Sequence, residues 1–494
     1  MIRRILIAAI VTLLMYGGAG VPTPDAATLS VDSRNPRYFS NGSGKAIYMA
    51  GSATWFILYE NVHPIDRQRA SDFLDWLQSW GHDYTRVWSF PFYVTNTTAA
   101  PDTLPYRRTG PGRANDGELK FDLTRPNEAY FELVRNFLAE IEARGMYCSI
   151  MLFGSGISFR EKGAYRIQNA WHPENNINPA TSAIKTGADF YAMAPGLLSL
   201  QEDHVRRVID LLNPFDNFVW EIINEAELPA SKQWQYHMIR FIRDYEKTKP
   251  KQHLIIMSGG NNEAGGILED SPADIISPDA SFGDYRRGGP AAYDEKIVVN
   301  DTDHLWGFSK VEQAEVYRKW VWKTFLRGNH PIFMDDYDSF INGNNGKINP
   351  VYDGVRKNMG DTIDYSRRFA DLARMLPEPE AASTRYALID AGREYLVYFP
   401  GDDDKAKKEA SSPDAAGFFG RLWSKFTSQP RPDGRSFTVT LRPGTYLREW
   451  FDPTSAKRLQ DTLTCGKEGP VVFDVPAEMA DDVVVYLKRV GDGG

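Results

Sequence analysis

The feature that most constrains the fold is a repeated alternation of short apolar, β-branched segments with longer amphipathic ones. Segments of the first kind are typical of buried parallel strands, and segments of the second kind are typical of the helices that connect them. The strands are expected at residues 46–52, 83–89, 146–153, 217–224, 253–258, 274–277, 296–301 and 330–335. The helices are expected at residues 66–80, 127–144, 199–212, 232–247, 311–327 and 361–375.

Eight strands in this alternation predict an α/β fold, a closed (β/α)8 TIM barrel, over residues 28–376. Helix 127–144 shows the helical period well, because its apolar residues fall on one face. No convincing helical pattern lies between the sixth and seventh strands. Before the first strand, residues 28–45 predict a short hairpin that covers the bottom of the barrel.

The pattern changes after the proline-rich break Pro377-Glu378-Pro379. Short segments with alternating apolar and polar residues follow, separated by turn-forming residues, and this is typical of antiparallel sheets. These strands are expected at residues 394–399, 436–441, 446–451, 470–474 and 482–488. We therefore expect a C-terminal β-sandwich domain over residues 380–494.

The N-terminus has the layout of a secretory signal peptide, which we expect over residues 1–27. Arg3 and Arg4 precede an apolar run from Ile5 to Met15, which is too short to span a bilayer comfortably. No later segment is apolar enough to do so. The sequence therefore predicts a secreted or periplasmic protein without membrane insertion after the signal is cleaved.

Charge and cysteine content exclude several classes of function. The formal net charge of −8 gives no basic surface for nucleic acid. The two cysteines, Cys148 and Cys465, stand far apart and are expected to be buried apolar residues rather than a zinc site or a disulfide. Phosphate-loop and serine-hydrolase motifs are absent from the sequence.

The strongest candidate for chemistry is Glu225, which follows an apolar strand and comes directly after Asn224. Cleavage of a glycosidic bond needs a carboxylic acid beside the leaving oxygen and a second carboxylate across the sugar. Glu225 would be that acid, and the Asn224 amide could donate to a sugar hydroxyl. The alternative is a carboxylate that merely begins the next helix.

A second candidate cluster, Asp301, Asp303, His304 and Trp306, follows the seventh strand. Asp301 and Asp303 share a face by strand alternation, so either can supply the second carboxylate. His304 and Trp306 would then contact the sugar. The alternative is a metal-dependent hydrolase, because Asp301, Asp303 and His304 offer oxygen and imidazole ligands.

Three residues on the first two strands are expected to line the sugar site. Arg86 and Trp88 alternate onto one face, where Arg86 could hold a catalytic carboxylate by hydrogen bonds and charge. An ion pair inside the barrel is the alternative for Arg86. Trp55, which ends the first strand, is a candidate sugar platform or a core residue.

Four further residues are candidates for substrate contact. Asp335 ends the eighth strand, where it could bind sugar hydroxyls or cap the following turn. Trp171, His172 and Asn176 stand in the long insertion after the third strand, on the face where barrel enzymes act. Asn residues are also common loop formers, so that reading stays open.

The chain resembles the cellulase-like, clan-A barrel glycosidases, in particular their apiosidase-related branch. The matching stretches are PRYFSNGSGKAIYMAGSATW (36–55), RGMYCSIMLF (144–153), FVWEIINEAE (218–227), NDTDHLWG (300–307), FLRGNHPIFMDDYD (325–338) and EYLVYFPG (394–401). The resemblance implies that Asn224 and Glu225 form the acid/base element. It also implies a collagen-binding-like β-sandwich at the C-terminus, a label that is no evidence of collagen binding here.

This sequence departs from the family at the nucleophile, which is usually a glutamate at the end of the seventh strand. Asp301 stands there instead, and its side chain is one methylene shorter. An inverting mechanism is therefore open, and so is a role for Asp303.

We expect a secreted glycoside hydrolase that acts on a polysaccharide or oligosaccharide and needs no cofactor and no metal. Catalysis is assigned to Glu225 and to Asp301 or Asp303. One alternative is a carbohydrate-binding protein that has lost catalysis, and the other is the metal-dependent hydrolase. The sequence leaves open the sugar, the linkage, endo or exo cleavage, the stereochemistry and the oligomeric state.

Overall fold

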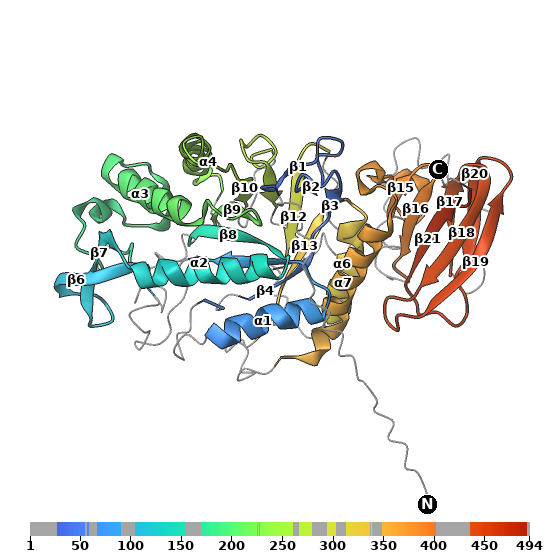
Figure 1. Cartoon of the computed structure of the whole chain (residues 1–494), viewed down its shortest axis with the longest axis horizontal. Coiled ribbons are helices and arrows are strands. Elements are labelled where there is room, and N and C mark those ends of the chain that lie inside the picture. Colours follow the sequence, from blue (N-terminus) through green and yellow to red (C-terminus); the bar gives the residue numbers. More distant parts are fainter. Residues whose placement is uncertain are drawn as a thin grey trace, which may run out of the picture.

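The computed structural model shows a barrel joined to a smaller domain of antiparallel sheets (Figure 1). The predicted signal peptide lies almost wholly outside the described residues. These are residues 27–54, 57–58, 67–89, 104–154, 169–224, 226, 228–259, 266–278, 294–302, 313–335, 337, 348–401 and 435–491.

The barrel is an eight-stranded sheet of parallel neighbours, which confirms the predicted fold class. Each predicted strand is present. In sheet order they are β4 (Gly51–Ala53), β13 (His330–Met334), β12 (Ile297–Asp301), β11 (Ile275–Ser277), β10 (Ile255–Ser258), β9 (Phe218–Ile223), β8 (Tyr147–Phe153) and β5 (Tyr84–Trp88).

The two end strands of this sheet, β4 and β5, close the barrel against each other. The backbone N–H of Asp83 donates to the carbonyl of Ala50 at 3.2 Å, and Thr85 Oγ1 donates to the carbonyl of Ser52 at 2.9 Å. Gly51 makes this approach possible, because a Cβ atom there would lie 2.0 Å from the carbonyl oxygen of Tyr84.

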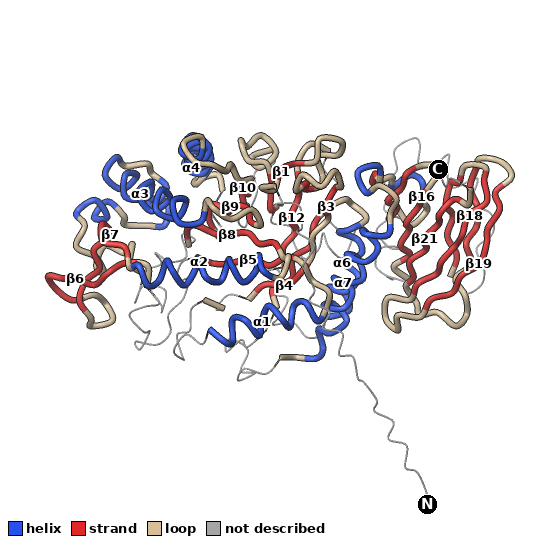
Figure 2. The backbone as a smooth tube through the Cα atoms, in the orientation of Figure 1, coloured by secondary structure: helices blue, strands red, loops and turns tan. Residues whose placement is uncertain are grey.

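Helices lie outside the strands, as in other (β/α)8 barrels (Figure 2). They bury apolar faces against the sheet; in α2, for example, Phe137 and Ile141 are almost fully buried. The helices are α1 (Arg67–Ser79), α2 (Glu128–Ala143), α3 (Pro195–Leu212), α4 (Lys232–Glu246), α6 (Ala314–Phe325) and α7 (Asp353–Arg368).

The predicted bounds of the last helix, 361–375, are wrong. The helix α7 begins at Asp353 and ends at Arg368, after which Phe369 is extended. Gly360 weakens the helical pattern in the sequence, since glycine is a poor helix former. The structure explains it, because a Cβ atom at Gly360 would lie 2.1 Å from the carbonyl oxygen of Trp80.

A small antiparallel sheet covers the bottom of the barrel, which confirms the expected hairpin and adds a third strand. Its strands are β1 (Ser30–Val31), β2 (Phe39–Ser40) and β3 (Ala46–Ile47). Asn41 donates to the hydroxyl of Tyr147 at 3.3 Å. The ring of His330 contacts the carbonyl of Arg37 at 2.9 Å. Both Tyr147 and His330 begin barrel strands, so the sheet holds their N-terminal ends.

The first long insertion contains a ribbon of β6 (Tyr106–Arg113) and β7 (Leu119–Pro126), at the far end of the molecule from the sandwich domain (Figure 1). The second contains two short 3-10 helices, Pro179–Ala183 and Gly187–Tyr191. The backbone N–H of Phe121 donates to the carbonyl of Asn175 at 2.8 Å, which joins the two insertions.

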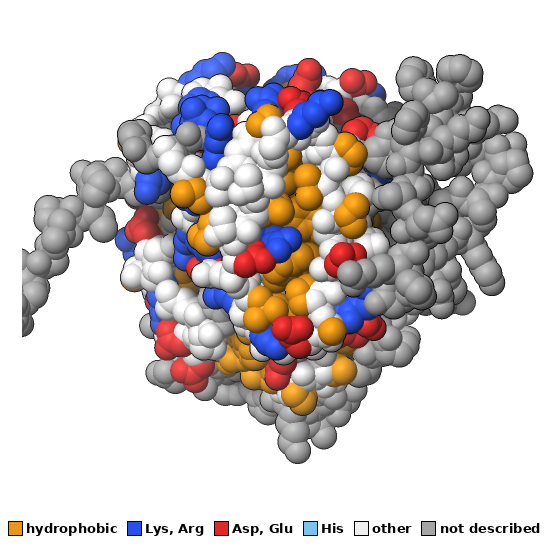
Figure 3. All heavy atoms as spheres, turned by 90° about the vertical axis from the view of Figure 1, so that its right-hand side faces the viewer, with side chains coloured by type: hydrophobic (Ala, Val, Ile, Leu, Met, Phe, Trp, Pro, Cys, Tyr) orange, Lys and Arg blue, Asp and Glu red, His pale blue; other side chains and the backbone are white. Residues whose placement is uncertain are grey.

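The C-terminal domain pairs a six-stranded with a two-stranded antiparallel sheet. Every predicted strand is present, together with three that were missed, β14, β15 and β19. The large sheet has the order β14 (Leu376–Pro377), β15 (Ala387–Asp390), β16 (Glu394–Phe399), β21 (Val483–Arg489), β18 (Gly444–Phe451) and β19 (Arg458–Cys465). The small sheet consists of β17 (Ser436–Leu441) and β20 (Gly469–Asp474). Seen from the right-hand end of the molecule, a band of hydrophobic side chains runs between polar and charged ones (Figure 3).

The barrel and the C-terminal domain share a buried interface. Arg318 on α6 makes two hydrogen bonds to Asp482, at 2.9 and 2.8 Å. Arg368 on α7 donates to Glu449 at 2.7 Å. One continuous core includes Trp322 of α6 and residues of both domains. None of the helices among the described residues is long and apolar enough to cross a membrane.

Candidate active site

The interior of the barrel holds a buried arginine that bridges two carboxylates. Arg86 on β5 donates from Nε to Glu221 on β9 at 2.9 Å, and from Nη1 to Oδ2 of Asp301, the last residue of β12. These side chains are 2%, 0% and 5% exposed, respectively. The structure therefore brings the predicted Arg86 and Asp301 together inside the barrel.

Small polar residues on neighbouring strands complete this network. Ser149 on β8 donates to Glu221 at 3.1 Å, and Ser258 on β10 donates to it at 2.5 Å. Ser277 on β11 lies 3.5 Å from Nη2 of Arg86. Buried charges are costly unless they are paired and hydrogen-bonded, and these serines supply hydrogen bonds while leaving room for the long side chains.

The network keeps Arg86 charged. Burial by itself lowers the pKa of Arg86, but the neighbouring charges of Asp301 and Glu221 outweigh this effect, so the pKa is raised overall. The single positive charge of Arg86 is shared by two carboxylates. This interior suits a reaction in which positive charge develops, because opposite charges attract strongly where water is excluded.

Two other predicted residues meet at the rim of this interior. Nε1 of Trp88 donates to Oδ1 of Asn224 at 3.3 Å, and both residues are almost fully buried. The guanidinium of Arg86 lies 5.9 Å from the centre of the Trp88 ring. Because the Asn224 oxygen accepts this bond, its amide nitrogen is the donor end of the side chain.

Several predicted residues cannot be placed. Glu225, Asp303, Trp55, His304 and Trp306 lie outside the described residues, and their roles stay predictions. Among the described residues, no group of three or more His, Cys, Asp or Glu side chains is arranged to hold a metal ion.

Asp335, which follows β13, is engaged by an arginine of α7. Arg356 donates from Nε to Oδ2 at 3.0 Å and from Nη2 to Oδ1 at 2.6 Å, and neither side chain is exposed. The Arg356 guanidinium also lies 5.1 Å from the centre of the Trp76 ring on α1. These contacts fix the end of β13 to α7. The predicted substrate contact of Asp335 stays a prediction that they do not favour.

The predicted loop residues make contacts typical of loop formers. Asn176 donates to the carbonyls of Ala170 and His172, at 3.0 and 2.9 Å. Its side-chain oxygen accepts from Thr181 Oγ1 at 2.9 Å. The half-buried Trp171 packs in an edge-on arrangement with four aromatic rings, those of Tyr106, Phe153, Phe190 and His204. Sugar contacts by Trp171, His172 and Asn176 stay predictions.

Glu221 is the important residue that the sequence analysis did not single out. Its signal was visible, because it is a charged residue in the middle of the otherwise apolar strand Phe218–Ile223. A carboxylate buried there must have a cationic partner. Arg86, inside another apolar strand, was the candidate for that partner.

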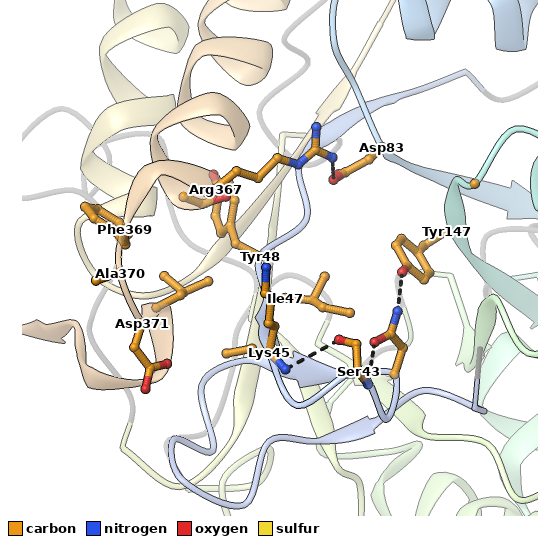
Figure 4. A pocket seen from close by; sticks show the side chains of 15 residues that line it. Ser43, Lys45, Ile47, Tyr48, Asp83, Tyr147, Arg367, Phe369, Ala370 and Asp371 are labelled. Carbon is orange, nitrogen blue, oxygen red and sulfur yellow. Dashed lines mark hydrogen bonds and ion pairs between the residues drawn. The ribbon is translucent and has the colours of Figure 1, made fainter. Parts of the chain in front are cut away.

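A cavity of about 330 Å³ lies at the opposite end of the barrel (Figure 4). Its lining includes Asp83, which precedes β5, and Tyr147, which begins β8. Asp83 accepts a hydrogen bond from Arg367 at 3.1 Å, yet burial raises the pKa of Asp83 to about 7. Barrel enzymes act at the carboxyl ends of their strands, so this cavity is not the candidate active site.

Comparisons with known proteins agree with this fold. A family profile described as a domain of unknown function, DUF6298, matches residues 85–277. No curated protein matches the chain. A solved structure described as a glycoside hydrolase is 11% identical, with a TM-score of 0.59 and coverage of 94% of this chain and 97% of that one.

Two solved structures from Bacteroides vulgatus ATCC 8482 are also similar. A glycoside hydrolase family 5 protein is 12% identical, with a TM-score of 0.59 and coverage of 94% of this chain and 93% of that one. A second protein, described as a glycoside hydrolase by inference, is 14% identical, with a TM-score of 0.56 and coverage of 94% and 83%. The chain therefore has the fold of these solved glycoside hydrolases over most of its length. The apiosidase-related branch and the collagen-binding-like domain stay predictions.

Proposed function

We propose that the chain is a secreted glycoside hydrolase that cleaves O-glycosidic bonds of a polysaccharide or oligosaccharide. The observation that carries the proposal is the buried contact between Arg86 and Asp301 at the end of the seventh barrel strand. A glycosidase needs a second carboxylate across the sugar from its acid, and an arginine beside such a group attracts its negative charge. The barrel fold shared with glycoside hydrolases supports the same conclusion.

In this mechanism Glu225 protonates the departing glycosidic oxygen. Asp301 either attacks the anomeric carbon or removes a proton from the water that does so, and Asp303 is the alternative for this role. Attack by a carboxylate requires the two carboxyl groups to lie about 5–5.5 Å apart, while activation of water requires about 6.5–9.5 Å. The shorter aspartate side chain favours the larger separation.

The remaining candidates would form the sugar site around these two acids. Asn224 donates its amide nitrogen to a sugar hydroxyl, and Trp88 fixes the orientation of that amide through its indole N–H. Aromatic rings offer apolar faces to the faces of sugar rings. The proposed contacts also include Trp55, Trp171, His172, Asn176, His304 and Trp306, whereas both oxygens of Asp335 are held by Arg356.

A pair of aspartate variants tests the assignment of the second carboxylate. We expect Asp301→Asn to lower kcat about 1,000-fold or more, because the ionised group is lost from the reaction. Asp303→Asn should have a much smaller effect. Asp461→Asn, which changes an exposed acid of β19, is the matched control and should leave kcat unchanged.

A larger loss of kcat in Asp303→Asn than in Asp301→Asn would assign the second carboxylate to Asp303. Full activity in both variants would contradict the two-carboxylate mechanism. Thermal unfolding of each variant shows whether a loss of kcat reflects a loss of folded protein.

A further inference from the structure

We infer that Glu221 is a positioning residue that divides Arg86 between two carboxylates and thereby keeps Asp301 reactive. The inference deepens the proposed function and rests on it for its consequence in catalysis. Its effect on the ionisation of Asp301 can be measured without any substrate.

Glu221 is built into the interior as an anion. Its side chain has no exposed surface, and it accepts hydrogen bonds from Arg86, Ser149 and Ser258. These three donors satisfy both oxygens of the carboxylate, as a buried polar group requires. Because the side chain has no exposed surface, Glu221 is not placed to touch a substrate and acts through Arg86.

The geometry of Arg86 shows what Glu221 prevents. Arg86 uses Nε for Glu221 and Nη1 for Asp301, so each carboxylate receives one edge of the guanidinium. Two other buried arginines show the alternative arrangement. Arg356 contacts both oxygens of Asp335, and Arg318 contacts both oxygens of Asp482. Such two-point pairs are the stronger form of the interaction.

Without the charge of Glu221, Arg86 would be left with Asp301 as its only anionic partner within this network. The full charge of the guanidinium would then act on Asp301, and their attraction would become stronger. Glu221→Gln would also remove the repulsion between the two carboxylates that share Arg86. Both changes lower the pKa of Asp301 and make it a weaker nucleophile or base.

Glu221→Gln is the variant that tests this, because glutamine has nearly the same shape and lacks the charge. Glu246→Gln is the matched control. Glu246 is 1% exposed and accepts hydrogen bonds from Trp220, Asn213 and the backbone of His253, but it lies on α4 outside the barrel strands. Glu246→Gln therefore shows whether the removal of any buried glutamate charge shifts the titration of Asp301.

The direct readout is the titration of Asp301 by NMR in full-length protein labelled with ¹³C at the aspartate carboxyl carbons. The Asp301 signal is the one absent from Asp301→Asn. In Glu221→Gln we expect its titration to move to lower pH by on the order of one unit. Glu246→Gln should leave it in place. An unchanged or higher titration in Glu221→Gln would overturn the inference.

Ser258→Ala gives a second test that keeps the charge of Glu221. Removing the Ser258 donor makes Glu221 depend more on Arg86, so Arg86 holds Asp301 less and the Asp301 titration should move to higher pH. The two variants therefore predict opposite shifts. If Glu221→Gln does not fold, Ser258→Ala decides, and a shift to lower pH or no shift overturns the inference.

Activity measurements distinguish this inference from the proposed function. In an active enzyme, the acidic limb of the kcat/KM profile should follow the Asp301 titration to lower pH in Glu221→Gln, and kcat should fall about tenfold. A wild-type protein that cleaves no glycan refutes the proposed function, while the NMR titration still decides the role of Glu221. An unshifted acidic limb in an active variant overturns the inference alone.

Discussion

Two buried aspartates at the ends of adjacent strands are held by arginine in different ways. Asp301 ends β12 and Asp335 follows β13, and these two strands pair with each other. Arg356 contacts both oxygens of Asp335, whereas Arg86 contacts one oxygen of Asp301 and divides its charge with Glu221. Asp335 ties the end of β13 to the helix α7 outside the barrel. Asp301 lies in a network of charges in the barrel interior.

This difference indicates which carboxylate can take part in chemistry. An aspartate whose two oxygens both accept from one arginine is committed to that pair, because turning toward another group breaks both bonds at once. Arg86 engages Asp301 through one nitrogen and shares its charge with Glu221. Burial and an arginine partner are therefore not sufficient to identify a reactive carboxylate, and the way in which the arginine is shared must be considered.

The largest contrast is expected from the same substitution at both arginines. Arg86→Lys should lower kcat about 100-fold or more, because lysine has one donor atom where Arg86 uses the separate Nε and Nη1 to reach two carboxylates. Arg356→Lys should leave kcat within about threefold, since the contacts of Arg356 to Asp335, Asp353 and Trp76 lie outside the interior network of Arg86. Steady-state kinetics on folded protein checks this. Equal losses in both variants would remove the functional distinction between the two pairs.

A stability measurement sharpens the same comparison. Arg356→Met leaves Asp335 buried without its two-point partner, and we expect the free energy of unfolding to fall by about 3–5 kcal/mol. Urea unfolding followed by circular dichroism measures this, with exposed Arg385→Met as the control. A loss below about 1 kcal/mol would show that the Asp335–Arg356 pair does not anchor the strand.

A third aspartate, Asp83, is buried, but its arginine partner Arg367 is largely exposed to solvent. Arg367 is 68% exposed, and the pKa of Asp83 is raised to about 7 because burial dominates. The folded protein therefore binds a proton at Asp83 more tightly than the unfolded chain does. The contribution of Asp83 to the free energy of unfolding is therefore largest at low pH, and it is lost as the pH rises from about 4 to about 7.

Asp83→Asn should consequently become more stable relative to the wild type as the pH rises. The gain between pH 4 and pH 8 is at most about 4 kcal/mol, because raising the pKa of Asp83 from 3.8 to about 7 corresponds to about that difference in free energy. Asn can keep the bond from the backbone N–H of Ala50 but loses the pairing with Arg367. Thermal unfolding at both pH values tests this. A difference in Tm that does not change with pH would contradict the raised pKa.

The sequence was sufficient to predict the architecture but not the pairing inside it. Hydrophobic period located all eight barrel strands, because parallel strands are buried on both faces. It missed β19, whose mostly exposed residues Arg458–Cys465 mix charged and polar side chains with few apolar ones. It misplaced α7, because Gly360 is required by contact with Trp80 rather than by helix propensity.

Side-chain partners were harder to predict for a physical reason. Arg86 was expected to hold a carboxylate, but its partners come from β9 and β12, far apart in the sequence. Only the closed barrel places them together. The partner of Asp335 was also missed, because Arg356 lies in α7, whose predicted range began only at residue 361.

The most direct test of the account is hydrolysis of a panel of plant and bacterial polysaccharides by the wild type and by Glu225→Gln, with the products identified by NMR. We expect the wild type to release new reducing ends from at least one glycan, and Glu225→Gln to lose nearly all of this activity with an unchanged Tm. Binding of a glycan without any product, or full activity in Glu225→Gln, would contradict the assignment of this barrel as a two-carboxylate glycoside hydrolase.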